Sequence, residues 1–356
     1  MNEQVAPSVH RERILYLDGW RGIAIVTVLI GHFNTSLYMA GSLGVELFFV
    51  LSGRLMASIL FEEKYPLKDF FVRRFSRIFP ALAFYCLVVF SLTVAAEVAG
   101  VSFKALPSLM DTLSALTFTI NYKVALESGA MLVHHIWSVS VEEHCYMILA
   151  LLALLLSRNT VTVVRACLIL ALAAMVNGVA LWLNDVGGIH EIYWRTDVRL
   201  ASVFLSVAVY LTTRNLPEKA GLLCLVCIPA GVALILGPTP DPVKFTLGTA
   251  LLALAVNCLD YAPAAVKWLL STRPIVMIGL WSYSIYLWQQ PFSRLHGKVP
   301  TPLLLLGIAA VALGSFYLIE TPARRFINQR WKSIALRRPA RSIHPSRAPA
   351  SWQSDV

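Results

Sequence analysis

The sequence predicts an all-α integral membrane protein: a bundle of about ten transmembrane helices with the N- and C-termini in the cytoplasm. Of its 356 residues, 57% are hydrophobic and 14% are charged, whereas roughly 25% of a soluble domain is charged. A single water-soluble core cannot bury that much apolar surface. The apolar residues also form runs of about 20, the length that crosses the hydrocarbon of a bilayer. The expected spans are 14–34, 43–61, 79–99, 135–157, 163–184, 198–213, 220–237, 244–260, 274–292 and 302–319.

The basic residues indicate the orientation. Of the 30 Lys and Arg residues, 21 fall on the side that holds both ends of the chain, and six fall on the other side. Cytoplasmic loops carry the excess of Lys and Arg, so both termini are expected in the cytoplasm. The net charge of +10 does not indicate nucleic-acid binding. These residues stand at span ends and in the tail, where they suit anionic membrane lipid.

We divide the chain into three parts. Residues 1–13 are a polar cytoplasmic segment, 14–326 form the membrane domain, and 327–356 form a basic tail that we expect to be disordered along the inner leaflet. All six cysteines fall in apolar segments, so no disulfide framework is indicated. "HHIWSVSVEEH" contains metal-ligand residue types but no HExxH arrangement, and no metal is expected.

The first span, "YLDGWRGIAIVTVLIGHFNTS", carries two ionisable residues, Arg21 and His32. Eleven residues are about three helical turns, so both lie on one face with a rise of about 16 Å between them. Arg21 at the cytoplasmic rim is compatible with a simple interfacial anchor. His32 near the outer end indicates function, because ionisable groups within a span are costly. An imidazole can remove a proton from an alcohol near neutral pH, although a structural hydrogen bond remains the alternative.

Further polar residues occur at matching depths. The second span places Glu46 near its outer end and Arg54 about 12 Å further in. The fourth span opens with "HHIWSVSVEEHCY", which brings Ser138 and Glu142 to the outer half.

The cytoplasmic loop "FVRRFSRIFP" contains Arg73, Arg74 and Arg77. Arginine suits phosphate recognition. A cationic rim with a His/Glu cluster deeper in the membrane therefore predicts a ligand with an anionic head and a reactive far end.

These segments resemble the acyltransferase-3 family of bacterial membrane acyltransferases over nearly all of residues 14–326. "LDGWRGIAIVTVLIGH" is similar to the family's first motif, in which ten residues separate an arginine and a histidine. "GVELFFVLSG" is similar to the second, with Glu46 where the family usually has aspartate. "RRFSRIFP" resembles the arginine-rich loop, and 137–142 the Trp-Ser-x-x-x-Glu segment. "IGLWSYSIYLWQQP" and "IETPARRF" complete six motifs in the family's order.

The resemblance implies transfer of an acyl group, most often acetyl, from cytoplasmic acyl-CoA to a hydroxyl, usually of a sugar. Carried over by position, His32 is the expected catalytic residue, and Glu142 supports it at the acceptor end. The implied contacts for the CoA phosphates are Arg21, Arg73, Arg74 and Arg77. The residues expected to bind substrate are Glu46, Trp137 and Ser138.

Two positions depart from the family pattern. Gln289 replaces a histidine often found after "YLW", which puts a catalytic or acceptor-binding role at that position in doubt. Arg54 stands where an aromatic or aliphatic residue is usual, and either contributes to donor binding or pairs with Glu46.

The resulting hypothesis explains the separation of Arg21 and His32. The CoA phosphates lie against the arginines, and the pantetheine arm runs beside the first span to deliver the thioester near His32. His32 is then either a general base or the acceptor of a transient acyl group. Glu142 would orient the imidazole, as a carboxylate does in a catalytic triad.

We expect the protein in the bacterial cytoplasmic membrane, with membrane lipid around it and a carbohydrate or glycolipid as acceptor. Acylation of a small molecule such as a macrolide is an alternative acceptor chemistry. A proton-coupled transporter would also place ionisable residues at mid-membrane, although no inverted repeat is visible. A catalytically inert scaffold would keep the fold but bind no CoA.

Overall fold

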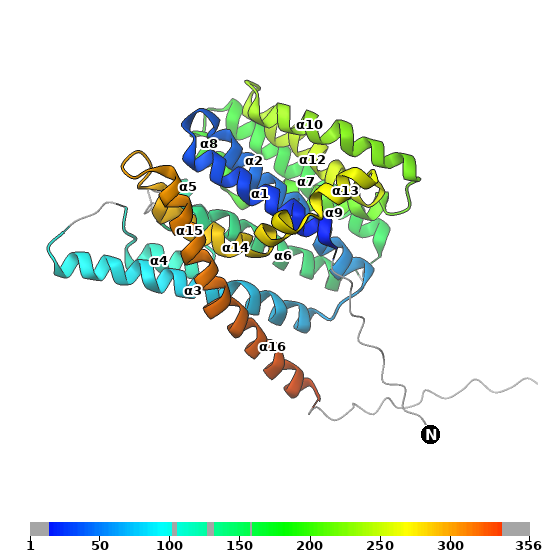
Figure 1. The fold of residues 1–356 in the computed structure, drawn as a ribbon. Coiled ribbons are helices and arrows are strands. Elements are labelled where there is room, and N and C mark those ends of the chain that lie inside the picture. The colour runs from blue at the N-terminus through cyan, green and yellow to red at the C-terminus, as the bar shows by residue number, and fades with distance from the viewer. Residues whose placement is uncertain (1–13, 102–104, 127–131, 157–158, 337–356) are drawn as a thin grey trace, which may run out of the picture.

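The computed structural model describes residues 14–101, 105–126, 132–156 and 159–336. Within these ranges the chain is helical and contains no β-strand, so the predicted all-α class is confirmed (Figure 1). The longer helices are α1 (Leu15–Phe33), α2 (Met39–Met56), α3 (Leu67–Val98), α6 (Trp137–Leu155), α7 (Thr160–Leu183), α9 (Thr196–Thr213), α10 (Leu222–Leu236), α12 (Thr249–Asn257), α14 (Arg273–Ser293), α15 (Thr301–Ser315) and α16 (Thr321–Leu336). The shorter ones are α4 (Leu109–Leu116), α5 (Ile120–Leu126), α8 (Ile189–Tyr193), α11 (Asp241–Val243) and α13 (Ala264–Leu270).

Seven of the described helices are long and apolar enough to cross a membrane. They are Met39–Glu62, Leu67–Val98, His134–Leu155, Thr160–Leu183, Thr196–Thr213, Lys219–Leu236 and Thr301–Ile334. The expected spans at 14–34, 244–260 and 274–292 are also helical, but α1 and α14 carry more polar residues and α12 has only nine residues. Large apolar side chains such as Ile169, Val226 and Leu306 face outward. Surfaces of this kind need lipid, and the chain is a multi-pass membrane protein.

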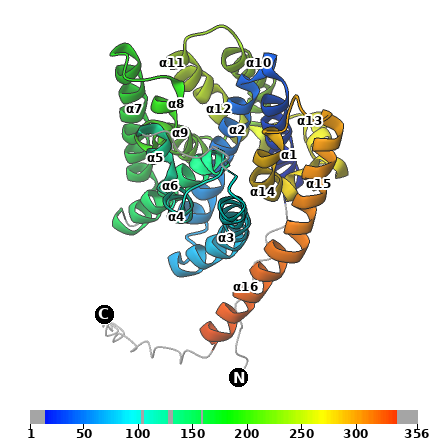
Figure 2. The ribbon, with the colours of Figure 1, turned by 90° about the vertical axis from the view of Figure 1, so that its left-hand side faces the viewer.

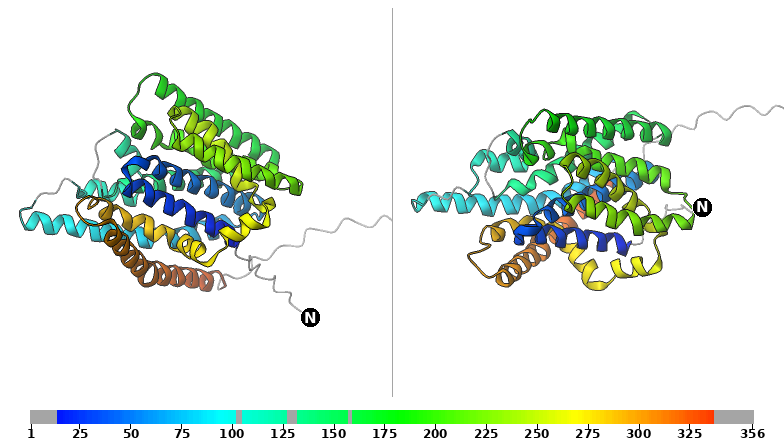
Figure 3. Two further views of the ribbon diagram at one scale, coloured as in Figure 1. Left: turned by 45° about the horizontal axis from the view of Figure 1, so that its top comes forward. Right: turned by 90° about the horizontal axis from the view of Figure 1, so that it is seen from above.

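Helix α1 packs between α2 and α14 (Figure 3). Two glycines bring α1 and α14 into backbone contact. A Cβ atom at Gly279 would lie 1.9 Å from the carbonyl oxygen of Asp18, and one at Gly22 would lie 2.2 Å from that of Ile275. Small residues at helix crossings allow such close approach. This crossing fixes which residues of α14 stand beside His32.

The arginine-rich segment expected as a loop at 71–80 is helical. Arg73, Arg74 and Arg77 lie in the first turns of α3, which begins after Pro66 and has 32 residues. A helix of that length measures about 48 Å, whereas the hydrocarbon of a bilayer is about 30 Å thick. The arginines can therefore extend beyond the apolar layer while remaining on a rigid helix.

The basic tail also begins later than expected. Helix α15 continues through a π-helical turn, Phe316–Glu320, into α16, so residues 327–336 are helical rather than disordered. The reason is tertiary: α16 crosses α3 as it runs out below the bundle (Figures 1 and 2), and the indole of Trp331 donates a hydrogen bond to Asp69 at 2.5 Å. Residues 1–13 and 337–356 lie outside the described part of the chain.

Candidate functional site

A cavity of about 1090 Å³ opens between α2, α3, α6, α14 and α16. Its volume exceeds the roughly 300–1000 Å³ of typical small-molecule sites, so it suits a large ligand. At one end, which we call the arginine end, Arg21, Arg73 and Arg77 line the opening. At the other, the inner end, the lining is completed by Ser138 and Tyr286.

Two of the four arginines expected to contact the donor are engaged by carboxylates. Arg21 donates a hydrogen bond to Asp18 at 2.9 Å, one turn earlier on α1. Arg74 lies 2.9 Å from Glu143 and 3.6 Å above the ring of Tyr146. Arg74 still lines the cavity, but its strongest contacts are within the protein.

Arg73 and Arg77 differ from these two. In the described part of the chain neither has a carboxylate within 4 Å, and both line the cavity. The guanidinium of Arg73 lies 4.8 Å from the centre of the Tyr65 ring. Burial raises the pKa of the Tyr65 hydroxyl against the opposing influence of Arg73, so this ring stays neutral at physiological pH. Arg73 and Arg77 therefore present guanidinium groups to the cavity that no carboxylate contacts within 4 Å in the described part of the chain.

His32 lies on α1 three turns beyond Arg21 and is half-buried. One ring nitrogen, Nδ1, is hydrogen-bonded to the side-chain oxygen of Gln289 on α14. That oxygen can only accept, so Nδ1 carries the hydrogen and Nε2 is left as an acceptor. The Gln289 amide nitrogen also donates to the side-chain oxygen of Gln290 at 3.3 Å. The sequence did not predict this pairing. The one indication was that Gln289 directly follows "YLW", where the family often has a histidine.

Glu142 does not occupy the place expected for it. Its carboxylate accepts a hydrogen bond from Ser52 at 2.7 Å and lies 4.0 Å from Arg74. Among the residues that the structure describes, the hydrogen-bond partner of His32 is Gln289 and not Glu142. Glu142 therefore lines the cavity on its arginine side, while the imidazole is oriented by an amide.

The inner end of the cavity is closed by hydrogen bonds. Ser138 and Tyr286 share one between their hydroxyls at 2.7 Å. The Tyr286 hydroxyl also donates to the backbone carbonyl of His135. Tyr286 precedes Gln289 by three residues, nearly one helical turn. The cavity thus ends about one turn short of the His32–Gln289 pair.

Two residues expected to bind substrate lie outside the cavity lining. Glu46 is fully buried, 2.6 Å from Arg199, and accepts a hydrogen bond from Thr249 at 2.8 Å. Trp137 is also buried and stacks on Trp194, with ring centres 5.5 Å apart. Both residues pack and pair inside the protein. Of the three, Ser138 alone reaches the cavity.

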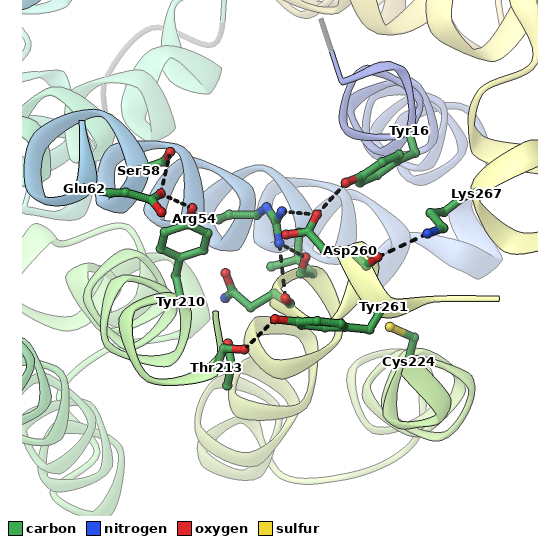
Figure 4. A network of polar contacts seen from close by, with 12 residues as sticks. Tyr16, Arg54, Ser58, Glu62, Tyr210, Thr213, Cys224, Asp260, Tyr261 and Lys267 are labelled. Carbon is green, nitrogen blue, oxygen red and sulfur yellow. Dashed lines mark hydrogen bonds and ion pairs between the residues drawn. The ribbon is translucent and has the colours of Figure 1, made fainter. Parts of the chain in front are cut away.

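Arg54 does not pair with Glu46, as one expectation had it, and it lines no part of the cavity. Figure 4 shows its guanidinium between α2 and α12. It donates to the backbone carbonyls of Val256 and Asn257 at 2.8 and 3.2 Å and lies 2.5 Å from Asp260. The hydroxyl of Tyr16 also donates to Asp260. Arg54 thus satisfies carbonyls at the C-terminus of α12 that have no partner within the helix, and ties that helix to α2.

The structure also places residues at the arginine end that sequence reasoning missed. Four come from α16: Arg324, Asn328, Trp331 and Lys332. Their spacing of four, three and one residues is that of one helix face, which is the signal that was present in the sequence. Within the described ranges, no group of three or more His, Cys, Asp or Glu side chains could hold a metal ion.

Comparison of the chain with known protein families identifies the family to which it belongs. The model of the acyltransferase-3 family, described as an acyltransferase domain, matches residues 14–320. Because the match covers most of the chain, the protein belongs to this family.

Two similar proteins come from Staphylococcus aureus. The O-acetyltransferase OatA of strain NCTC 8325 is 26% identical over 357 aligned residues, which cover 87% of this chain and 57% of the relative. The putative O-acetyltransferase SACOL0978 of strain COL is 25% identical, with the same shares covered. The chain therefore spans little more than half the length of these relatives. No solved structure matches it.

Proposed function

We propose that this protein is a membrane-bound O-acyltransferase. It moves an acyl group, most often acetyl, from cytoplasmic acyl-CoA to a hydroxyl of a sugar in a cell-surface or secreted glycan or glycolipid. One observation carries the proposal: a cavity leads from arginines that no carboxylate contacts within 4 Å, in the described part of the chain, to within one helical turn of a histidine whose Nε2 is available as a base. Family membership and the O-acetyltransferase relatives support the same activity.

The donor would enter through the arginine end from the cytoplasm. Its phosphates would lie against Arg73 and Arg77, which form charge-assisted hydrogen bonds with phosphate oxygens. The rise of about 16 Å between Arg21 and His32 is comparable to the pantetheine arm. The thioester would then lie at the inner end, beside Ser138 and Tyr286. For the carbonyl carbon to reach His32, the hydrogen bond between these two hydroxyls would open.

The chemistry follows from the tautomer of His32. As the acceptor oxygen attacks the thioester carbon, Nε2 removes the hydroxyl proton. The carbon–sulfur bond breaks, the proton passes to the sulfur, and the products are an ester and free CoA. Gln289 holds the Nδ1 hydrogen and keeps Nε2 aimed away from α14. A variant path forms an acyl-imidazole at Nε2 first. Labelled protein recovered after incubation with labelled acetyl-CoA and no acceptor would indicate that path.

Two measurements test the function. Purified protein incubated with labelled acetyl-CoA should release CoA at an appreciable rate only when a glycan acceptor from the same cells is added. Mass spectrometry of surface glycans should then reveal ester-linked acetyl groups in cells with the protein and not in cells without it. CoA release that no acceptor stimulates, together with unchanged glycans, would contradict the proposal.

A further inference from the structure

Helix α16 presents one face to the arginine end of the cavity. Arg324, Asn328, Trp331 and Lys332 line it, and the donor contacts proposed above do not use them. From Arg324 to Lys332 the helix rises by about 12 Å. The two cationic groups are therefore placed along the opening rather than at a single point.

This face is held in a fixed position opposite the arginines of α3. Trp331 donates its indole hydrogen to Asp69 at 2.5 Å, and the hydroxyl of Ser76 donates to the side-chain oxygen of Asn328 at 3.3 Å. Asp69 and Ser76 bracket Arg73 on α3. The two helices thus form the walls of one opening, with basic side chains on both.

The opening has an excess of positive charge. Six basic side chains line the cavity, against the three carboxylates of Glu63, Asp69 and Glu142. In the described part of the chain, neither Arg324 nor Lys332 has a carboxylate within 4 Å. The acidic residue one turn before Arg324, Glu320, accepts a hydrogen bond from Ser284 at 2.8 Å. Clefts lined by one sign of charge concentrate ligands of the other sign.

We propose that this face of α16 binds the phosphorylated adenosine of the acyl donor. It would thereby select CoA thioesters over thioesters of phosphopantetheine alone. The inference rests on the proposed function. Arg73 and Arg77 of α3 face the pyrophosphate, and the basic face of α16 from Arg324 to Lys332 lies along the phosphorylated ribose. Guanidinium and ammonium groups suit phosphate, and an aromatic ring such as that of Trp331 can stack on a base.

Calorimetry on the full chain in lipid nanodiscs tests this with three probes: CoA, 3′-dephospho-CoA and 4′-phosphopantetheine. The wild-type protein should bind CoA at least about tenfold more tightly than phosphopantetheine, since one phosphate contact contributes about 1.5 kcal/mol or more. Lys332→Gln and Arg324→Gln should each weaken CoA binding about five- to tenfold and leave phosphopantetheine binding unchanged. Arg330→Gln is the matched control, because Arg330 is an exposed residue of α16 that does not line the cavity.

The possible outcomes are distinct. Equal binding of CoA and phosphopantetheine by the wild-type protein would overturn the role of α16 and leave the donor assignment intact. The role of α16 would also be overturned if Lys332→Gln and Arg324→Gln lost affinity for CoA and phosphopantetheine equally. The same holds if Arg330→Gln lost as much affinity for CoA as they do. Wild-type protein that binds none of the three probes would remove the donor assignment itself. Lys332 is exposed at the end of a helix, so Lys332→Gln should fold normally, which circular dichroism checks.

Discussion

The two ends of the cavity are built in opposite ways. At the arginine end, Arg73 and Arg77 line the cavity and, in the described part of the chain, have no carboxylate within 4 Å. At the inner end, Ser138 and Tyr286 are hydrogen-bonded to each other, and His32 beyond them is paired with Gln289. Arginines without a bonded carboxylate can bind an anion. A hydrogen bond from one ring nitrogen of His32 instead determines which nitrogen carries the hydrogen. On the proposed function, donor binding and chemistry would therefore occupy separate regions of this protein.

The largest effect is expected at the inner end. His32→Ala should lower kcat for acetyl transfer about a thousandfold, because general base catalysis contributes about 10²–10⁴-fold. Affinity for CoA should stay unchanged, since the imidazole is about 16 Å from Arg21 along the helix. Turnover of labelled acetyl-CoA and calorimetry would measure the two quantities. Near-normal turnover in folded protein would show that His32 is not catalytic. It would also contradict the assignment of chemistry to the inner end of the cavity.

A buried charge outside the cavity should act on stability rather than on either kinetic constant. Glu46→Gln would leave Arg199 buried without its carboxylate, which lies at 2.6 Å. Breaking such a pair costs about 3–5 kcal/mol, and the thermal midpoint in detergent should fall clearly. The double variant Glu46→Gln/Arg199→Met should recover much of the loss. If Glu46→Gln has normal stability and a raised KM for substrate, Glu46 binds substrate as the sequence predicted.

A variant of Gln289 tests whether this residue sets the tautomer of His32. Gln289→Leu should lower kcat about tenfold to a hundredfold, because the hydrogen bond that fixes Nδ1 is lost and buried groups without partners cost about 1–3 kcal/mol. KM for acetyl-CoA should not change. The pH dependence of kcat should shift relative to wild type, which a purely structural role would not produce. An unaltered pH profile with reduced stability would assign Gln289 to packing.

The smallest effects are expected at the arginine end. Arg73→Ala and Arg77→Ala should each raise KM for acetyl-CoA about tenfold, as expected for the loss of one charge-assisted hydrogen bond, with little change in kcat. Arg330→Ala is a suitable control, since this arginine is exposed on α16 and does not line the cavity. An unchanged dependence of rate on acetyl-CoA concentration in both variants would contradict phosphate binding at this end.

Sequence reasoning was most reliable for features that repeat along one helix. Runs of apolar residues predicted the all-α class, and seven of the expected spans meet the length and composition of membrane helices. The spacing of Arg21 and His32 predicted a common face, and α1 is a regular helix over both positions. These features depend on the geometry of a single helix, which the order of residues determines by itself.

The sequence did not predict which side chains of different helices contact each other. The sequence could not show that Glu46 pairs with Arg199, that Arg54 pairs with Asp260, or that Glu142 binds Ser52 rather than His32. Each carboxylate had several basic or polar groups at a similar depth, and depth alone does not select a partner.

The sequence by itself determined that the protein is helical, apolar and built around an arginine and a histidine on one helix. Only the tertiary structure decided that Gln289 meets His32, because the backbone contact at Gly279 sets how α14 crosses α1. It likewise decided that α16 forms one wall of the cavity opening, through hydrogen bonds from Trp331 and Ser76. The physical reason is that periodicity fixes the faces of a helix, whereas packing decides which faces meet.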